Sequence, residues 1–107
     1  MLLAVDVGNT QTHVGLFRDE ELLEHWRFHT SRTATADELA VVLGGLLRLR
    51  ENSLRDVDAI VASCVVPTLA QELNPGATPR FPRRGICAGN LERRIRVLNS
   101  EAPEMVC

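Results

Sequence analysis

The feature that most constrains the fold is a short apolar run at the start of the chain that leads directly into a tight polar turn. Leu2–Val7 has the pattern of a buried strand, and Gly8-Asn9-Thr10 follows it as a turn. His13–Phe17 alternates apolar and polar positions, and after a second polar turn Leu22–Thr30 has the composition of a third strand. Tight turns between three successive strands predict an antiparallel meander.

A helix signal follows the meander. Thr35 is a suitable N-cap, and Glu38 three residues later completes a capping box ahead of apolar residues at three- and four-residue spacing. Residues 58–63 form the next apolar strand, which we expect to run parallel to the first because a helix precedes it. Pro67–Leu73 has the pattern of a short helix with proline in its first turn. The predicted order is therefore β-β-β-α-β-α, an α/β fold with a mixed sheet.

The composition changes at Asn74-Pro75-Gly76, which is itself a turn signal. Residues 1–73 carry eleven acids against six arginines, whereas residues 74–107 carry three acids against six arginines and hold four of the five prolines. We predict one domain over 1–73 and an irregular or disordered Arg/Pro-rich tail over 74–107, with at most a strand near Ile95–Leu98. Without a periodic helix, solvated disorder is the expected state of this basic tail, in preference to nucleic-acid binding.

Several classes of protein are excluded by the sequence. No apolar run has the length needed to span a bilayer, and the N-terminus has no basic segment of the kind that begins a secretory signal. Three widely spaced cysteines (Cys64, Cys87 and Cys107) do not form a disulfide framework or a zinc motif. We therefore expect a cytoplasmic protein without a membrane partner.

The first turn has the residues that a phosphate site requires. Gly8 lacks a Cβ, so backbone amides there can approach an anion closely, and Asn9, Thr10 and Thr12 add side-chain donors. Asp6 cannot bind phosphate directly, but it can hold a hydrated Mg²⁺ that bridges to phosphates. All twelve basic residues are arginine, so no lysine can serve as a phosphate ligand. The alternative interpretation is an ordinary hairpin, because the same residue types are common in tight turns.

The motifs along residues 1–73 resemble those of one family, the type III pantothenate kinases. The matching motifs, in chain order, are Asp6-Val7-Gly8-Asn9-Thr10 with Gly15-Leu16-Phe17, His25-Trp26-Arg27 with Thr30, Thr35-Ala36-Asp37-Glu38-Leu39, Asp58-Ala59-Ile60-Val61, and Ser63-Cys64-Val65-Val66-Pro67. No matching motif is recognised from Asn74 onward.

This resemblance implies an actin-like fold of two ribonuclease-H-like domains, of which residues 1–73 would be the N-terminal one. It implies transfer of the γ-phosphate of ATP to pantothenate, giving 4'-phosphopantothenate for coenzyme A synthesis, with Mg²⁺, a monovalent cation (K⁺ or NH₄⁺) and a homodimer. Asp6 would organise the magnesium through water. The implied ATP phosphate-binding residues are Asp6, Val7, Gly8, Asn9, Thr10, Gln11, Thr12 and His13.

The catalytic base of the family lies in a G-x-D-R motif, and the 107 residues contain none. No catalytic residue is therefore assigned. We expect this chain to be a truncated or frame-disrupted product that is inactive alone, or one whose tail is a replacement with another role. The alternative function is a non-catalytic nucleotide- or DNA-binding accessory or regulatory factor of the same family.

Overall fold

The computed structural model describes residues 1–74 and 76–86. Seven helices and strands occur in these residues, in the order β1 (Leu2–Val7), β2 (Gln11–Arg18), β3 (Glu21–His29), α1 (Ala36–Arg48), β4 (Ala59–Cys64), α2 (Pro67–Ala70) and β5 (Arg84–Ile86). Two single turns of 3-10 helix accompany them, η1 (Leu54–Asp56) and η2 (Gln71–Leu73).

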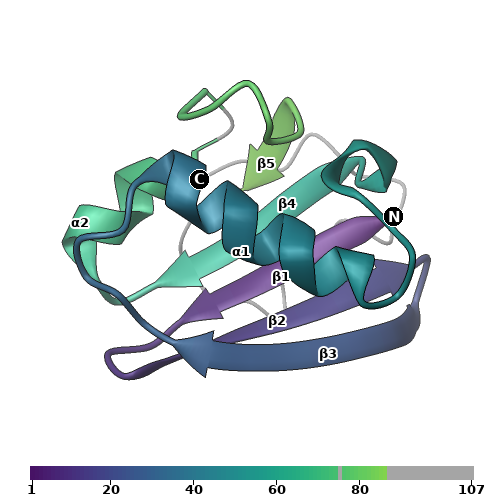
Figure 1. Cartoon of the computed structure of the whole chain (residues 1–107), viewed down its shortest axis with the longest axis horizontal. Helices are drawn as coiled ribbons and strands as arrows, with labels where there is room; N and C mark the ends of the chain where they lie inside the picture. Colours follow the sequence, from purple (N-terminus) through teal and green to yellow (C-terminus); the bar gives the residue numbers. More distant parts are fainter. Residues whose placement is uncertain (75, 87–107) are drawn as a thin grey trace.

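The strands form one mixed five-stranded sheet in the order β3-β2-β1-β4-β5 (Figure 1). The meander is antiparallel, with β1 paired to β2 and β2 paired to β3. The predicted parallel pairing of β1 with the strand after the helix is confirmed, since Leu2 pairs with Ala59 and Val7 with Cys64. The carboxyl ends of β1 and β4 therefore lie at the same edge of the sheet.

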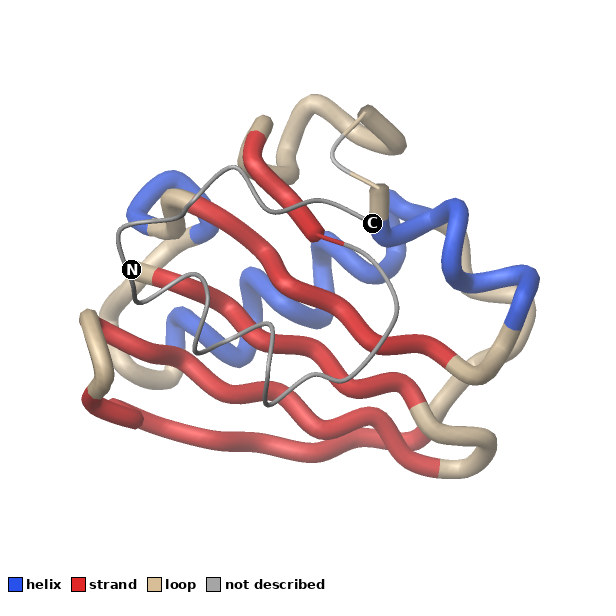
Figure 2. The backbone as a smooth tube through the Cα atoms, turned by 180° about the vertical axis from the view of Figure 1, so that it is seen from behind, coloured by secondary structure: helices blue, strands red, loops and turns tan. Residues whose placement is uncertain are grey.

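Helix α1 covers one face of the sheet, and Figure 2 shows the strands from the opposite face, with α1 behind them. Alternation along β1 directs Leu3, Val5 and Val7 into the main core beneath the helix. Leu2 and Ala4 point to the other face, where they form a second buried cluster with strand β4. Strand β1 is thus buried on both faces, as its continuous apolar run predicts.

The start of α1 confirms the predicted capping box. The backbone N–H of Glu38 donates to the Thr35 hydroxyl at 3.2 Å, and the backbone N–H of Thr35 donates to the Glu38 carboxylate at 3.0 Å. Two backbone donors that have no partner in the helix are satisfied in this way, and the entry of the chain into α1 is fixed.

The structure differs from the predicted irregular tail in residues 76–86. Here β5 pairs in parallel with β4, the Phe81 side chain is buried in the main core, and the Thr78 hydroxyl donates to the Asp37 carboxylate at 2.8 Å. These contacts all join residues distant in sequence, so local composition did not reveal them. The strand predicted near Ile95–Leu98 lies outside the described residues, and the domain boundary at residue 73 stays a prediction.

Smaller differences concern element bounds. Strand β2 begins at Gln11, two residues before the predicted start, and the short helix predicted over Pro67–Leu73 is one α-helical turn followed by the 3-10 turn η2. The 3-10 turn η1, which precedes β4, was not predicted.

Candidate phosphate-binding site

The predicted phosphate turn, Gly8-Asn9-Thr10, joins β1 to β2 at the edge of the sheet where β4 also ends. The backbone N–H of Val65, just after β4, donates to the Val7 carbonyl at 3.1 Å, so the loop after β4 is held next to the turn. In open sheets with parallel strands, ligands bind at this kind of edge, outside the carboxyl ends of the strands.

The backbone of the turn is closed by Gly8. Its N–H donates to the Gln11 carbonyl at 2.9 Å, and a Cβ built at this position would lie only 2.9 Å from that same oxygen. Glycine is thus required because the two backbone segments approach so closely. The N–H of Gly8 is thus used inside the turn, and the approach of the neighbouring amides to an anion stays a prediction.

Thr30, the residue after β3, fastens the turn at two points. Its hydroxyl donates to the Gly8 carbonyl at 2.8 Å, and its backbone N–H donates to the Thr10 carbonyl at 2.9 Å. The Thr12 hydroxyl lies 2.9 Å from the Thr30 hydroxyl, and because the Thr30 proton is directed to Gly8, Thr12 is the donor.

Two amides of the turn remain for a ligand. Peptide bonds in the described residues are trans, so the N–H of Asn9 points opposite to the Gly8 carbonyl and therefore away from Thr30. Within residues 1–74 and 76–86, neither the Asn9 nor the Thr10 backbone N–H donates to another group. Their side chains are also exposed. The turn thus presents two adjacent N–H donors without an acceptor among the described residues, and such groups can bind anions.

Asp6 lies on the sheet face opposite α1, where it pairs in register with His13 of β2 and Ser63 of β4. Its carboxylate is exposed and has no hydrogen bond or ion pair with any residue that the structure describes. A free carboxylate two residues before the turn has the chemistry to hold a hydrated divalent cation. No group of three or more metal-binding side chains occurs among the described residues, so water or phosphate would complete the coordination.

The other predicted site residues divide into two groups. Gln11 and His13 are exposed, and both point to the same sheet face as Asp6. Val7 and Thr12 are 2% exposed, and their side chains lie on the sheet face that α1 covers, where they pack beneath the turn. For Thr12 this differs from the expectation that its hydroxyl would line the phosphates.

Arg32 is a residue of this region that the sequence interpretation did not single out. Its guanidinium Nη2 donates to the Asn9 side-chain oxygen at 3.2 Å, and its own carbonyl accepts from the Thr68 hydroxyl of α2 at 2.8 Å. Because the sequence has no lysine, arginine remained one of the possible phosphate ligands, beside backbone amides, hydroxyls and a metal ion. Which arginine could serve in this way depended on contacts between segments far apart in sequence.

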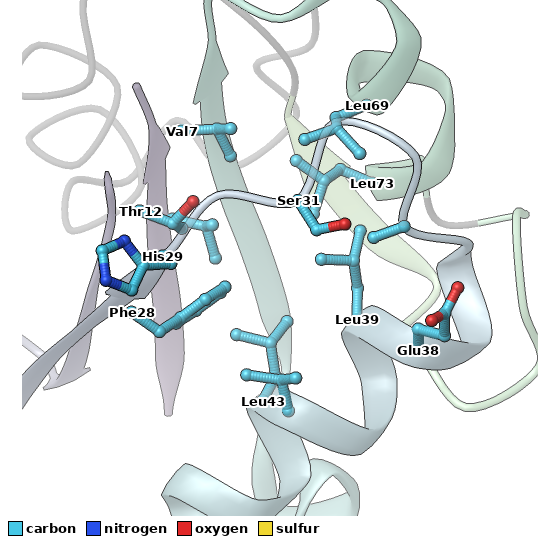
Figure 3. Close-up of a pocket in the computed structure, with 13 residues that line it drawn as sticks. Val7, Thr12, Phe28, His29, Ser31, Glu38, Leu39, Leu43, Leu69 and Leu73 are labelled. Carbon is cyan, nitrogen blue, oxygen red and sulfur yellow. The ribbon is translucent and has the colours of Figure 1, made fainter. Parts of the chain in front are cut away.

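A cavity of about 120 Å³ lies on the other side of the turn, between the sheet, α1 and the α2–η2 segment. Figure 3 shows Val7, Leu39 and Leu43 lining it, with the Thr12 hydroxyl at one side. Its lining is mainly apolar, and Asn9 and Thr10 do not belong to it. The cavity is therefore separate from the candidate phosphate site.

The fold and the turn together define an α/β protein with a mixed five-stranded sheet and a candidate phosphate turn after its first strand. A solved structure of a Porphyromonas gingivalis protein assigned as an N-acetylglucosamine kinase superposes with a TM-score of 0.56. The match covers 83% of this chain and 34% of that one, at 19% sequence identity, and so supports the fold alone.

A family model described as type III pantothenate kinase matches residues 2–102. The chain therefore belongs to the type III pantothenate kinase family. The matched range continues past residue 73, where the motifs recognised in the sequence end.

Curated relatives agree with this assignment. A type III pantothenate kinase from Exiguobacterium sibiricum is 38% identical over 98 residues, covering 92% of this chain and 35% of the relative. One from Thermobifida fusca is 47% identical over 73 residues, covering 68% and 28%. The chain thus spans about a third of the length of the curated relatives that it matches. Among the described residues, no helix has the length and apolar character needed to cross a membrane.

Proposed function

We propose that this chain supplies the ATP-phosphate half of the active site of a type III pantothenate kinase. That reaction transfers the γ-phosphate of ATP to pantothenate and gives 4'-phosphopantothenate, the first step of coenzyme A biosynthesis. The observation that carries the proposal is the pair of backbone N–H groups at Asn9 and Thr10, which have no acceptor among the described residues, on a turn that Thr30 holds in place.

The site residues have complementary tasks in this proposal. Asn9 and Thr10 would donate backbone N–H groups to phosphate oxygens. Asp6 would hold a hydrated Mg²⁺, a role that fits a carboxylate without a partner among the described residues. Bound there, the ion would neutralise negative charge on the phosphate oxygens and bridge them to the protein. The chain's own contribution is positioning and charge stabilisation.

Other parts of the proposal rest on the family alone. A monovalent cation, K⁺ or NH₄⁺, would accompany ATP, and the full-length protein would be a cytoplasmic homodimer. No described residue is assigned to the monovalent cation or to the catalytic base. We therefore propose that residues 1–107 bind nucleotide but do not transfer the phosphoryl group by themselves.

Nucleotide binding is tested by NMR titration of the ¹⁵N-labelled chain with Mg-ATP. We expect shifts centred on Asp6, Asn9 and Thr10, and we expect Asp6→Asn to remove the contribution of Mg²⁺ to the affinity. Asp19→Asn is the matched control, because Asp19 is an exposed carboxylate at the opposite end of β2, and its φ of 55° is tolerated by Asn. Shifts that avoid the turn would reject the proposed site.

Phosphoryl transfer is tested separately, by following ATP-dependent formation of phosphopantothenate. We expect no turnover by this chain, because general-base catalysis needs a positioned proton acceptor and none is assigned. Turnover at a rate typical of kinases would contradict this expectation. Nucleotide binding without turnover, combined with salt-dependent binding of DNA, would favour the accessory or regulatory alternative.

A further inference from the structure

Arg32 is held beside the phosphate turn from two sides. Its backbone carbonyl is fixed by the Thr68 hydroxyl of α2 at 2.8 Å, and its guanidinium donates to the Asn9 side chain at 3.2 Å. Two residues earlier, Thr30 fastens the same segment to Gly8 and Thr10. An exposed arginine normally samples many rotamers, so these contacts restrict where the guanidinium can lie.

The charge of Arg32 is not neutralised by the described part of the protein. Ion pairs with carboxylates do form elsewhere, as between Arg50 and Glu24 at 3.9 Å and between Arg80 and Asp37 at 3.3 Å. Across residues 1–74 and 76–86, no carboxylate pairs with Arg32. Its partner at the turn is a neutral amide oxygen, so the positive charge stays available to an anion.

The contact with Asn9 also leaves the guanidinium most of its donors. A guanidinium has five N–H groups in a planar fork that matches phosphate oxygens, and the Asn9 side-chain oxygen accepts only one of them. With that oxygen directed to Arg32, the side-chain NH₂ of Asn9 is left to donate. The turn therefore brings together backbone N–H groups, an amide donor and an unpaired cation.

We propose that Arg32 binds the polyphosphate of the nucleotide, as the cationic partner of the Asn9-Thr10 turn. The proposal rests on the proposed function, because it concerns the same ligand. It assigns to Arg32 the charge that a lysine supplies in many other phosphate sites, and this chain has no lysine. Asn9 acts as a positioning residue for Arg32 in addition to its own contact with the ligand.

The experiment measures the dissociation constants of three probes for the intact chain: Mg-ATP, inorganic tripolyphosphate with Mg²⁺, and adenosine. Arg32→Gln should weaken binding of ATP and of tripolyphosphate by about tenfold each, the usual effect of losing a charge-assisted hydrogen bond. Binding of adenosine should not change. Arg32→Lys should restore part of the affinity, because it keeps the charge but loses the fork.

Arg55→Gln is the matched control, because Arg55 is an exposed arginine in η1, outside the turn and the segments that hold it. Its dissociation constants should equal those of the wild type, and unfolding followed by Trp26 fluorescence should show that each variant is folded. If the wild type binds ATP at the turn and Arg32→Gln binds equally well, the role of Arg32 is overturned and the proposed function stands. If the wild type binds neither ATP nor tripolyphosphate, both are overturned.

Discussion

Thr30→Val is the substitution that most directly tests how the phosphate turn is held. Valine has the shape of threonine and keeps the preference for extended backbone, so the change removes only the hydroxyl. Two hydrogen bonds disappear with it, the one to the Gly8 carbonyl at 2.8 Å and the one from Thr12 at 2.9 Å. The backbone bond from Thr30 to Thr10 remains.

The expected loss of stability follows from the burial of the partners. Each hydrogen bond contributes about 1 kcal/mol net, and the Thr12 hydroxyl, on a side chain that is 2% exposed, would lose its acceptor away from water. We therefore expect Thr30→Val to lower the free energy of unfolding by about 2–3 kcal/mol. This is a large part of the stability of a small domain, which totals about 5–15 kcal/mol.

The assay is urea unfolding followed by the fluorescence of Trp26, the single tryptophan, which packs against the core from β3. Thr30→Ser keeps the hydroxyl and should cost less than about 1 kcal/mol. In the double variant Thr12→Val/Thr30→Val, the combined loss should be smaller than the sum of the single losses by about 1 kcal/mol, because no hydroxyl is then left unpaired. If Thr30→Val lowers the free energy of unfolding by less than about 0.5 kcal/mol, the proposed role of Thr30 in holding the turn is refuted.

The same unfolding assay checks two further predictions. Leu43→Ala should lower the free energy of unfolding by about 3–5 kcal/mol, because Leu43 is 1% exposed and the new void would join the existing cavity. Val41→Ala, on the exposed side of α1 (73% exposed), should change it by less than about 0.5 kcal/mol. Equal effects would contradict the assigned core face of α1. Gly8→Ala should destabilise the protein by about 1–3 kcal/mol, because the added Cβ would lie 2.9 Å from the Gln11 carbonyl oxygen. Gly45→Ala should stabilise α1 by about 0.5–1 kcal/mol, because a Cβ there would have no atom within 4 Å. A Gly8→Ala variant as stable as the wild type would show that the turn adjusts to the added Cβ without cost.

Local patterns in the sequence predicted the parts of the fold that local interactions determine. The bounds of β1 are those of its apolar run, and the start of α1 follows from the capping box of Thr35 and Glu38. Strand β5 was missed because it is only three residues long and is defined by its parallel pairing with β4, which no local pattern encodes.

The candidate site was predicted less completely than the fold. The sequence predicted a tight turn after β1, with Asp6 ahead of it and amides around Gly8 able to approach an anion. The structure shows the turn and shows that the N–H of Gly8 itself is used to close the hairpin. The roles of Thr30 and Arg32 depend on hydrogen bonds that span between 18 and 36 residues of sequence. Contacts of this range are invisible to periodicity and to residue type.

The central place of β1 in the sheet has a consequence for how tightly the turn can bind. With neighbouring strands on both edges and buried clusters on both faces, β1 can separate from the sheet only when the whole domain unfolds. The turn continues directly from this central strand, so its geometry should be set when the domain folds, and binding should cost little additional conformational entropy. Ligand occupancy at the turn should accordingly slow hydrogen exchange throughout β1, since binding would stabilise the same cooperative unit that protects that strand.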